Sequence, residues 1–321
     1  MKILEVSRYK KEYASHQLPF VTEQGESLRA AGCEVEYFLV RGNYLLAVRN
    51  LKKKIREYMP DVVHAHYGLS AITAELQGLV PVVTTFHNGE TLNPVVNFAS
   101  SLMSLRAKHV IYVAQHVRDL SYFKAKHYSI IPCGVPMEEC KVIDKAEARK
   151  QLGWSNNKKY ILFGGAFNNL RKNYPLLRDA VEHIGGNIEI VEMKGLSRAE
   201  CVLRMWGADL FALPSHSEGS PQALKEAMAC NCPCLATDIA DVKYLFGDEP
   251  GHWILRNPRK THERWDADEK SLDEMVELLR EALAFEGRTN GRERIMELEL
   301  SNEQVAKRII AIYQQVLKEK K

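Results

Sequence analysis

Residues 208–238 read ADLFALPSHSEGSPQALKEAMACNCPCLATD. The apolar run at 208–215 predicts a buried strand that ends in a loop. We expect a helix to begin at Pro221 with Ser220 as its N-cap, because a proline at the first helical position loses no hydrogen bond. The apolar run at 232–237 predicts a second strand. Strand, loop, helix and strand together form a βαβ crossover, the unit of a parallel sheet.

This crossover carries two carboxylates. Glu218 lies in the loop before the predicted helix, and Glu226 lies about a turn and a half inside it. The helical neighbours of Glu226 include Ala223 and Ala229, whose small side chains leave the carboxylate approachable. A helix N-terminus suits a phosphate, and carboxylates accept hydrogen bonds from sugar hydroxyls, so the stretch suits a sugar nucleotide. The alternative is that both glutamates are solvated surface residues.

The pattern SEGSP-x4-EAMA resembles the signature of the retaining glycosyltransferases of family 4, which have the GT-B fold. This resemblance implies an α/β protein with two doubly wound, Rossmann-like domains that face each other across a cleft. It implies that Glu226 binds the ribose hydroxyls of the donor, and that Glu218 binds hexose hydroxyls or stabilises developing positive charge. The backbone N–H groups of Gly219 and Ser220, and the helix that starts at Pro221, would hold the diphosphate.

A second segment, KYILFGG at 159–165, predicts a strand that runs into glycines. It does not meet the G-x-G-x-x-G pattern, which disfavours a dehydrogenase with a dinucleotide cofactor. In the family that the chain resembles, a Gly-Arg pair and a following lysine face the donor diphosphate. The resemblance therefore places Gly165 and Lys172 at the donor site, with Lys172 neutralising the leaving group, but Ala166 stands in place of the arginine. Either Arg171 supplies the missing charge, or the chain is a weak or inactive member.

Two histidines close predicted strands of the first half, His66 at the end of 61–66 and His87 at the end of 80–87. Ligands of doubly wound sheets bind beyond the carboxyl ends of the strands. A structural role is the ordinary expectation for a lone histidine at such a place. The segment FHNGE resembles the His-Gly segment that lines the sugar site in the family, which implies that His87, and also Glu90, contacts the sugar or the acceptor.

Strands and helices alternate in both halves, as in doubly wound parallel sheets. The segment SIIPCGVP at 129–136 resembles the hinge of the family, so we expect an acceptor-side domain at 1–140 and a nucleotide-sugar-binding domain at 141–301. By resemblance, the last helix at 302–318 packs back on the first domain. The basic segment RNLKKKIRE at 49–57 is either a solvated helix face or a contact with anionic lipid.

The composition is that of a soluble globular protein, with 321 residues, 45% hydrophobic and 26% charged. A net charge of +3 is too balanced to indicate nucleic acid, and no apolar run approaches the length of a membrane span or of a signal peptide's centre. Seven cysteines without regular spacing fit a reducing compartment, so we expect a cytoplasmic protein, either free or peripheral at the inner membrane face.

We expect no metal site. Cys230, Cys232 and Cys234 alternate as C-x-C-x-C, which lacks the spacing of a zinc site and favours small buried packing residues. The acidic run DADE at 266–269 lies in a charged segment and is expected to be solvated.

The resemblance therefore implies a retaining glycosyltransferase, and we expect it to need neither a metal nor a cofactor. It would move a sugar from a UDP- or GDP-linked donor to a sugar or lipid-linked acceptor, and segments such as DVVHAHYG and VPVVTTFH resemble bacterial enzymes of surface polysaccharide synthesis. Two alternatives remain, a sugar-nucleotide epimerase of the same fold and a catalytically weak nucleotide-sugar-binding relative. No residue presents itself as a nucleophile for double displacement, so same-face attack is what the resemblance implies.

Overall fold

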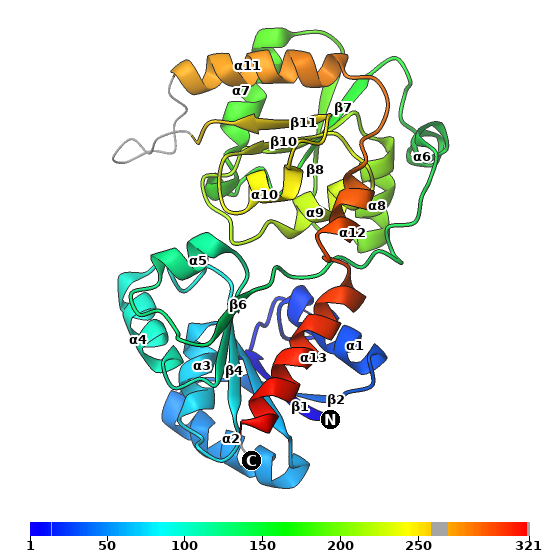
Figure 1. Cartoon of the computed structure of the whole chain (residues 1–321). Coiled ribbons are helices and arrows are strands. Elements are labelled where there is room, and N and C mark those ends of the chain that lie inside the picture. Colours follow the sequence, from blue (N-terminus) through cyan, green and yellow to red (C-terminus); the bar gives the residue numbers. More distant parts are fainter. Residues whose placement is uncertain (14, 258–268, 320–321) are drawn as a thin grey trace. The chain divides into compact units, whose positions relative to one another are not determined.

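The computed structural model describes residues 1–13, 15–257 and 269–319 (Figure 1). The chain divides into two compact units, Met1–Gly134 with Leu300–Lys321, and Val135–Glu299. The division falls after Gly134, whereas the sequence placed it near residue 140. In the part of the chain that the structure describes, no helix combines the length and apolar character needed to cross a bilayer.

The first unit is built on a six-stranded parallel sheet with the order β2-β1-β3-β4-β5-β6. Because β2 lies on one side of β1 and the later strands lie on the other, the order reverses between β1 and β3, as in a doubly wound sheet. The strands are β1 (Lys2–Arg8), β2 (Glu34–Val40), β3 (Val62–His66), β4 (Val82–Phe86), β5 (His109–Tyr112) and β6 (Tyr128–Ile130).

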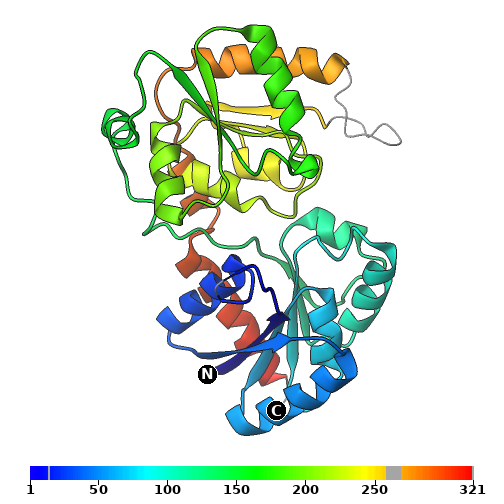
Figure 2. The ribbon, with the colours of Figure 1, turned by 180° about the vertical axis from the view of Figure 1, so that it is seen from behind.

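Among its described residues, this unit has six helices, which cover the sheet. The C-terminal helix α13 packs against α1, so the end of the chain returns to the first unit (Figure 2). A capping box formed by Ser301 and Gln304 starts α13, and Asn93 caps α4. The helices are α1 (Pro19–Ala30), α2 (Tyr44–Tyr58), α3 (Gly68–Glu75), α4 (Pro94–Ser104), α5 (Gln115–Leu120) and α13 (Asn302–Lys318).

The second unit has a five-stranded parallel sheet with the order β11-β10-β9-β7-β8. Its reversal point lies between β7 and β9, where the chain turns from one edge of the sheet toward the other. The strands are β7 (Lys159–Phe163), β8 (Ile188–Glu192), β9 (Leu210–Leu213), β10 (Cys234–Thr237) and β11 (His252–Leu255).

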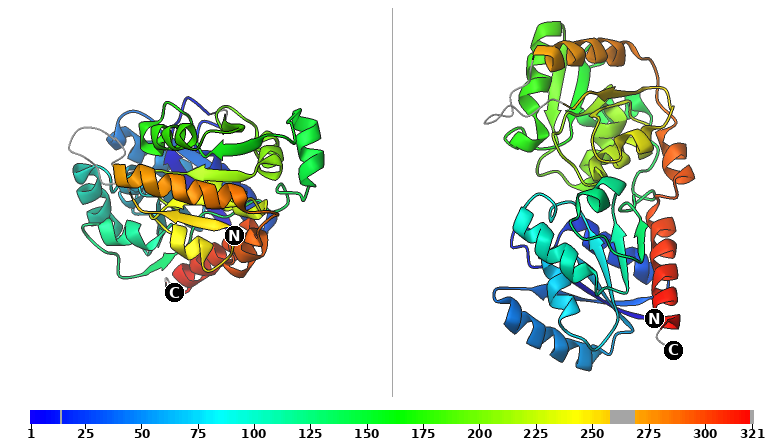
Figure 3. Two further views of the ribbon diagram at one scale, coloured as in Figure 1. Left: turned by 90° about the horizontal axis from the view of Figure 1, so that it is seen from above. Right: turned by 60° about the vertical axis from the view of Figure 1, so that its left-hand side comes forward.

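The helices α7 and α11 pack together on one face of this sheet (Figure 3). Asp144 caps α6, and Gly153 ends it in the left-handed conformation that glycine adopts without strain. The helical elements of this unit are α6 (Lys145–Leu152), the 3-10 turn η1 (Leu170–Lys172), α7 (Tyr174–Ile184), α8 (Arg198–Gly207), α9 (Gln222–Ala229), α10 (Val242–Phe246), α11 (Glu269–Ala284) and α12 (Gly291–Glu297).

The architecture confirms the predicted fold class, with a doubly wound α/β sheet in each unit. Cys230, Cys232 and Cys234 are fully buried, as the packing role required. Burial raises the pKa of the Cys232 thiol, which keeps it protonated. Of the acidic run 266–269, residues 266–268 lie outside the described part of the chain.

Candidate functional site

Two loops of the second unit meet at the reversal point of its sheet. One follows β7 and contains Gly165 and Lys172, and the other follows β9 and contains Glu218. A backbone hydrogen bond joins the loops, since the N–H of His216 donates to the carbonyl of Arg171 at 2.9 Å. Neighbouring parallel strands therefore bring together residues that lie far apart in the sequence, at the position where doubly wound sheets bind ligands.

The central contact is an ion pair between Lys172 and Glu218. Lys172 Nζ lies 2.7 Å from Glu218 Oε1, and the side chains are only 14% and 10% exposed. Asn169 fixes η1, which carries Lys172, by accepting a hydrogen bond from the backbone N–H of Arg171. The two predicted site residues thus form one partly buried pair of opposite charges.

Gly165 has a steric reason to be glycine. A Cβ atom at this position would lie 2.9 Å from Cγ of Lys172, closer than side-chain atoms approach one another. The aliphatic stem of Lys172 therefore crosses directly over the backbone of Gly165 on its way to Glu218. The side chain of Arg171, by contrast, is exposed.

The start of helix α9 differs from the prediction. The helix begins at Gln222, and Pro221 occupies the N-cap position, where it has no polar group to cap the helix. Ser220, the predicted cap, donates its hydroxyl to Oδ2 of Asp241 at 2.7 Å instead. The prediction was wrong because the chain before α10 supplies an acceptor for Ser220. Gly219 links this serine to Glu218 in the same loop.

Glu226 does not lie over an open surface. Its Oε1 lies 2.6 Å from Nη1 of Arg198, the first residue of α8, and its side chain is 14% exposed. Arg198 also approaches Glu139 at 3.5 Å. The sequence reasoning missed Arg198, although the capping box of Ser197 and Glu200 marks the helix start that positions it.

His87 lies in the first unit and belongs to a chain of polar side chains. Glu5 Oε2 lies 2.5 Å from Nε2 of His66, and Nδ1 of His66 lies 3.1 Å from Nε2 of His87. The ring of His87 packs against Phe20 and Tyr67, with centroid distances of 4.7 Å. Sequence reasoning missed Glu5, whose place in an apolar strand gave no sign of a polar role.

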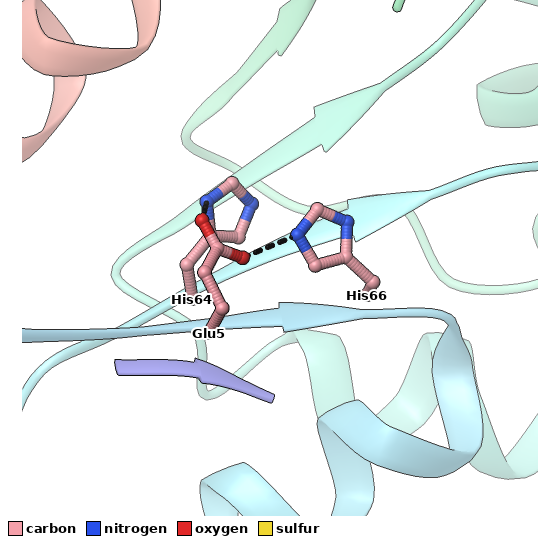
Figure 4. A group of neighbouring side chains, drawn as sticks. All are labelled: Glu5, His64 and His66. Carbon is pink, nitrogen blue, oxygen red and sulfur yellow. Dashed lines mark hydrogen bonds and ion pairs between the residues drawn. The ribbon is translucent and has the colours of Figure 1, made fainter. Parts of the chain in front are cut away.

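Glu5, His64 and His66 are close enough to hold a metal ion, with their ligand atoms within 4.8 Å of one another (Figure 4). Each of these atoms already has a protein partner, since His64 Nδ1 lies 2.5 Å from the hydroxyl of Tyr313 and His66 Nε2 contacts Glu5. Burial lowers the pKa of His64 to about 3, so this imidazole is neutral. Burial opposes ionisation of Glu5, but the neighbouring His64 and His66 lower its pKa.

A cavity of about 430 Å³ opens at the reversal point of the first sheet. Its lining includes Ser7 and Arg8 from the end of β1, Tyr67 from the end of β3, and Glu90. Glu90 Oε1 accepts a hydrogen bond from the N–H of His87 at 3.1 Å. Its buried Oε2 has no hydrogen-bond partner among the described residues, and burial raises the pKa of this carboxyl to about 7.

Both halves of the chain match glycosyltransferase families. Residues 22–139 match the model of Glycosyltransferase Family 4, and residues 189–283 match that of Glycosyl transferases group 1. TuaC of Bacillus subtilis (strain 168), named as a glycosyltransferase of teichuronic acid biosynthesis, is 27% identical over 229 residues. That match covers 60% of this chain and 57% of TuaC, so it spans little more than half of this relative.

Solved structures match over the whole fold. Sucrose-phosphate synthase (tll1590) from Thermosynechococcus elongatus is similar with a TM-score of 0.76 and 16% identity, over 99% of this chain and all 100% of that one. Anabaena Alr3699/HepE in complex with UDP has a TM-score of 0.73 and 14% identity, over 98% and 100% of the two chains. At these identities the likeness concerns the fold. A glycosyltransferase family model thus matches part of each half of the chain, and the fold is that of the GT-B glycosyltransferases.

Proposed function

We propose that the chain transfers a sugar, with retention of anomeric configuration, from a nucleoside diphosphate sugar to an acceptor hydroxyl. The observation that carries this proposal is the Lys172–Glu218 pair at the reversal point between β7 and β9, beside the start of α9. It combines a cation for a phosphate, a carboxylate for sugar hydroxyls and a helix N-terminus for negative charge. The structures of HepE in complex with UDP and with UDP-glucose support a UDP-linked donor here.

In the donor site, Lys172 and the backbone N–H groups of Gly219 and Ser220 would hold the diphosphate. Glu218, placed by Lys172, would then bind the hexose hydroxyls, and Glu226, placed by Arg198, would bind the ribose. Gly165 keeps the path of Lys172 open. Pro221 begins the turn from which the first N–H groups of α9 point outward.

The side chain of Arg171 is a second cation beside Lys172. Its exposure leaves it able to reach a bound phosphate, and it would then substitute for the arginine that Ala166 replaces. If Arg171 supplies this charge, the chain is an active enzyme; if it does not, the chain is a weak nucleotide-sugar-binding relative.

The acceptor would occupy the cavity of the first unit, where Glu90 offers a carboxylate oxygen to its hydroxyl. His87 acts on this site by positioning, since its backbone N–H holds Glu90 and its ring fills the space between Phe20 and Tyr67. With a pKa of about 7, this carboxyl is present in both protonation states near neutral pH, so it can accept or donate a hydrogen bond at the acceptor hydroxyl.

The transfer would proceed by attack on the same face of the sugar that the phosphate leaves. The bond between the anomeric carbon and the phosphate oxygen breaks as the acceptor oxygen bonds to that carbon. The acceptor proton passes to the departing phosphate, whose new charge Lys172 stabilises. No metal ion takes part in this scheme, so activity would persist in EDTA, and a strict requirement for Mg²⁺ or Mn²⁺ would contradict it.

The name of TuaC supports a role in bacterial surface polysaccharide synthesis, with a sugar or lipid-linked acceptor. We place the reaction in the cytoplasm, where the seven free cysteines remain reduced.

A screen of UDP and GDP sugars by thermal stabilisation identifies the donor, because a ligand that binds only the folded state raises the melting temperature. Transfer is then measured with that donor and candidate acceptors, and NMR of the product gives the anomeric configuration. An inverted product would refute retention. An isomerised sugar formed without acceptor would indicate an epimerase, and binding without any turnover would indicate a non-catalytic relative.

A further inference from the structure

Helix α4 of the first unit exposes apolar side chains and buries polar ones, the reverse of the usual arrangement. Its exposed apolar residues, Val95, Phe98, Leu102 and the adjoining Leu105, are 76%, 50%, 42% and 50% exposed. They recur at intervals of three and four residues, so they form one continuous stripe along the helix. A water-facing stripe of this kind on a helix of a soluble protein marks an interaction surface.

The polar side chains of α4 face inward instead. Asn97, Ser100, Ser101 and Ser104 are all buried. Ser101 and Ser104 donate their hydroxyls to carbonyls of the helix itself, at 2.6 and 2.7 Å. Asn97 donates to the carbonyl of Leu120 and accepts from the N–H of Tyr122. Because most of the inward polar groups have partners, the outward apolar stripe is the stable arrangement of this helix and not a packing fault.

The apolar stripe continues onto the neighbouring chain. Asn97 ties α4 to the segment Leu120–Tyr122, and both ends of that segment are more than half exposed, at 53% and 55%. Phe98 also contacts Phe123 edge to face, with centroids 5.4 Å apart. The exposed apolar surface therefore extends beyond a single helix.

The stretch of chain that carries this surface has a net positive charge. Between Thr91 and Met137 the sequence holds five basic residues and one acidic residue, a net charge of +4. The basic residues are Arg106, Lys108, Arg118, Lys124 and Lys126, and the acidic residue is Asp119.

Two of these cations line a hollow just beyond the C-terminal end of α4. Arg106 and Lys108 border this hollow of about 310 Å³, together with Leu79, which is 45% exposed. Glu75 also borders it, but burial raises the pKa of its carboxyl to about 8, so at neutral pH it is mostly uncharged. The hollow thus has room and charge for an anionic headgroup next to an apolar stripe.

We propose that α4 and its basic end dock the first unit onto an anionic lipid bilayer. Val95, Phe98 and Leu102 enter the acyl boundary, and Arg106 and Lys108 contact lipid phosphates. An apolar helix stripe bordered by lysine and arginine is the pattern of helices that lie in the membrane interface. An 11-residue helix is too short to span the bilayer, so it lies along the surface.

The structure favours this surface over the basic segment at 49–57. In α2 the apolar residues Leu51 and Ile55 face the core, and Lys53 and Lys54 pair with Glu57 and Glu36. Paired charges on a helix that buries its apolar face are the usual pattern of a solvated helix.

Vesicle flotation tests the proposal without any transfer reaction, so its result is independent of the proposed function. We expect the protein to float with vesicles containing phosphatidylglycerol and much less with pure phosphatidylcholine vesicles. The double variant Phe98→Ser/Leu102→Ser, and separately Arg106→Glu/Lys108→Glu, should each weaken binding by about tenfold or more. Added salt should weaken binding of the wild type.

The matched control is Val142→Ser/Tyr244→Ser in the second unit, where the two side chains are 69% and 53% exposed. It removes similar apolar surface and should leave vesicle binding unchanged. Circular dichroism melting shows that each variant is folded. Absence of wild-type binding, or equal binding of the α4 variants, would overturn the proposal. A wild-type dimer that the Phe98→Ser/Leu102→Ser variant dissociates in light scattering would also overturn it, because a second copy would then cover the stripe.

Discussion

Replacing Glu218 by glutamine should both destabilise the free protein and change its response to nucleotide. The substitution leaves Lys172 without its carboxylate at a position where the lysine side chain is only 14% exposed. Removing one partner of a fully buried ion pair costs roughly 3–5 kcal/mol, and exposed pairs contribute about 1 kcal/mol or less. For this partly buried pair at 2.7 Å we expect a loss of about 2–3 kcal/mol.

Urea unfolding at pH 7 measures this loss. The double variant Lys172→Met/Glu218→Gln should be more stable than the sum of the two single losses predicts, with a coupling of about 2 kcal/mol. The matched control is Glu189→Gln, which breaks the Lys158–Glu189 pair of the same unit. That pair has a distance of 2.9 Å and side chains that are 33% and 46% exposed, so solvent screens it and its loss should cost much less stability than Glu218→Gln.

UDP should affect the two single variants differently. The diphosphate of UDP replaces the lost carboxylate as the partner of Lys172, so UDP should raise the melting temperature of Glu218→Gln at least as much as that of the wild type. Lys172→Met should lose about tenfold to a hundredfold in UDP affinity, the range expected for one charged hydrogen bond. Additive stabilities in the double variant, or full UDP affinity in Lys172→Met, would refute this reasoning.

Three further results are expected. Glu226→Ala should weaken UDP binding in calorimetry by about tenfold, and Arg198→Met should do so less, because Arg198 only positions the carboxylate; equal wild-type affinity in Glu226→Ala would remove Glu226 from the site. Gly165→Ala should weaken UDP binding without unfolding the protein, because its Cβ displaces Lys172, and unaltered affinity would show that the path of Lys172 does not matter. The pKa of His64 in the folded protein, about 3, lies below its unfolded value, so its stabilising contribution is complete above about pH 6.5 and is lost as pH falls toward 3. His64→Gln should therefore flatten the dependence of the free energy of unfolding in urea on pH over that range. An unchanged slope would contradict this assignment.

The fold class could be predicted because strands and helices leave local patterns of apolar residues in the sequence. Apolar runs such as 61–66 and 80–87 correspond to β3 and β4, shifted by a residue or two at their ends. The residues around Glu218 and Glu226 also indicated which crossover carries polar groups. Neither pattern contains the strand order, so the meeting of the β7 and β9 loops became visible only in the structure.

Partners that are distant in sequence account for what could not be predicted. Glu218 and Lys172 are 46 residues apart, and Glu226 and Arg198 are 28 apart. Ser220 has the composition of an N-cap, but its hydroxyl prefers a carboxylate 21 residues further on. In each case the local sequence suggests one role for a side chain, but the folded chain brings a distant residue close enough to become its partner.

Helix α4 shows a different limit. Its apolar residues were compatible with a helix that buries them, which is the ordinary arrangement. The inward side is set instead by the partners that Asn97 finds at Leu120 and Tyr122, so the exposed stripe could not be inferred from periodicity.

A crystal structure with UDP or GDP bound, whichever raises the melting temperature more, tests the central claim most directly. The account predicts diphosphate oxygens within hydrogen-bond distance of Lys172 Nζ and the first N–H groups of α9, and a ribose hydroxyl on Glu226. A nucleotide bound away from β7 and β9, with the Lys172–Glu218 pair unchanged, would contradict it.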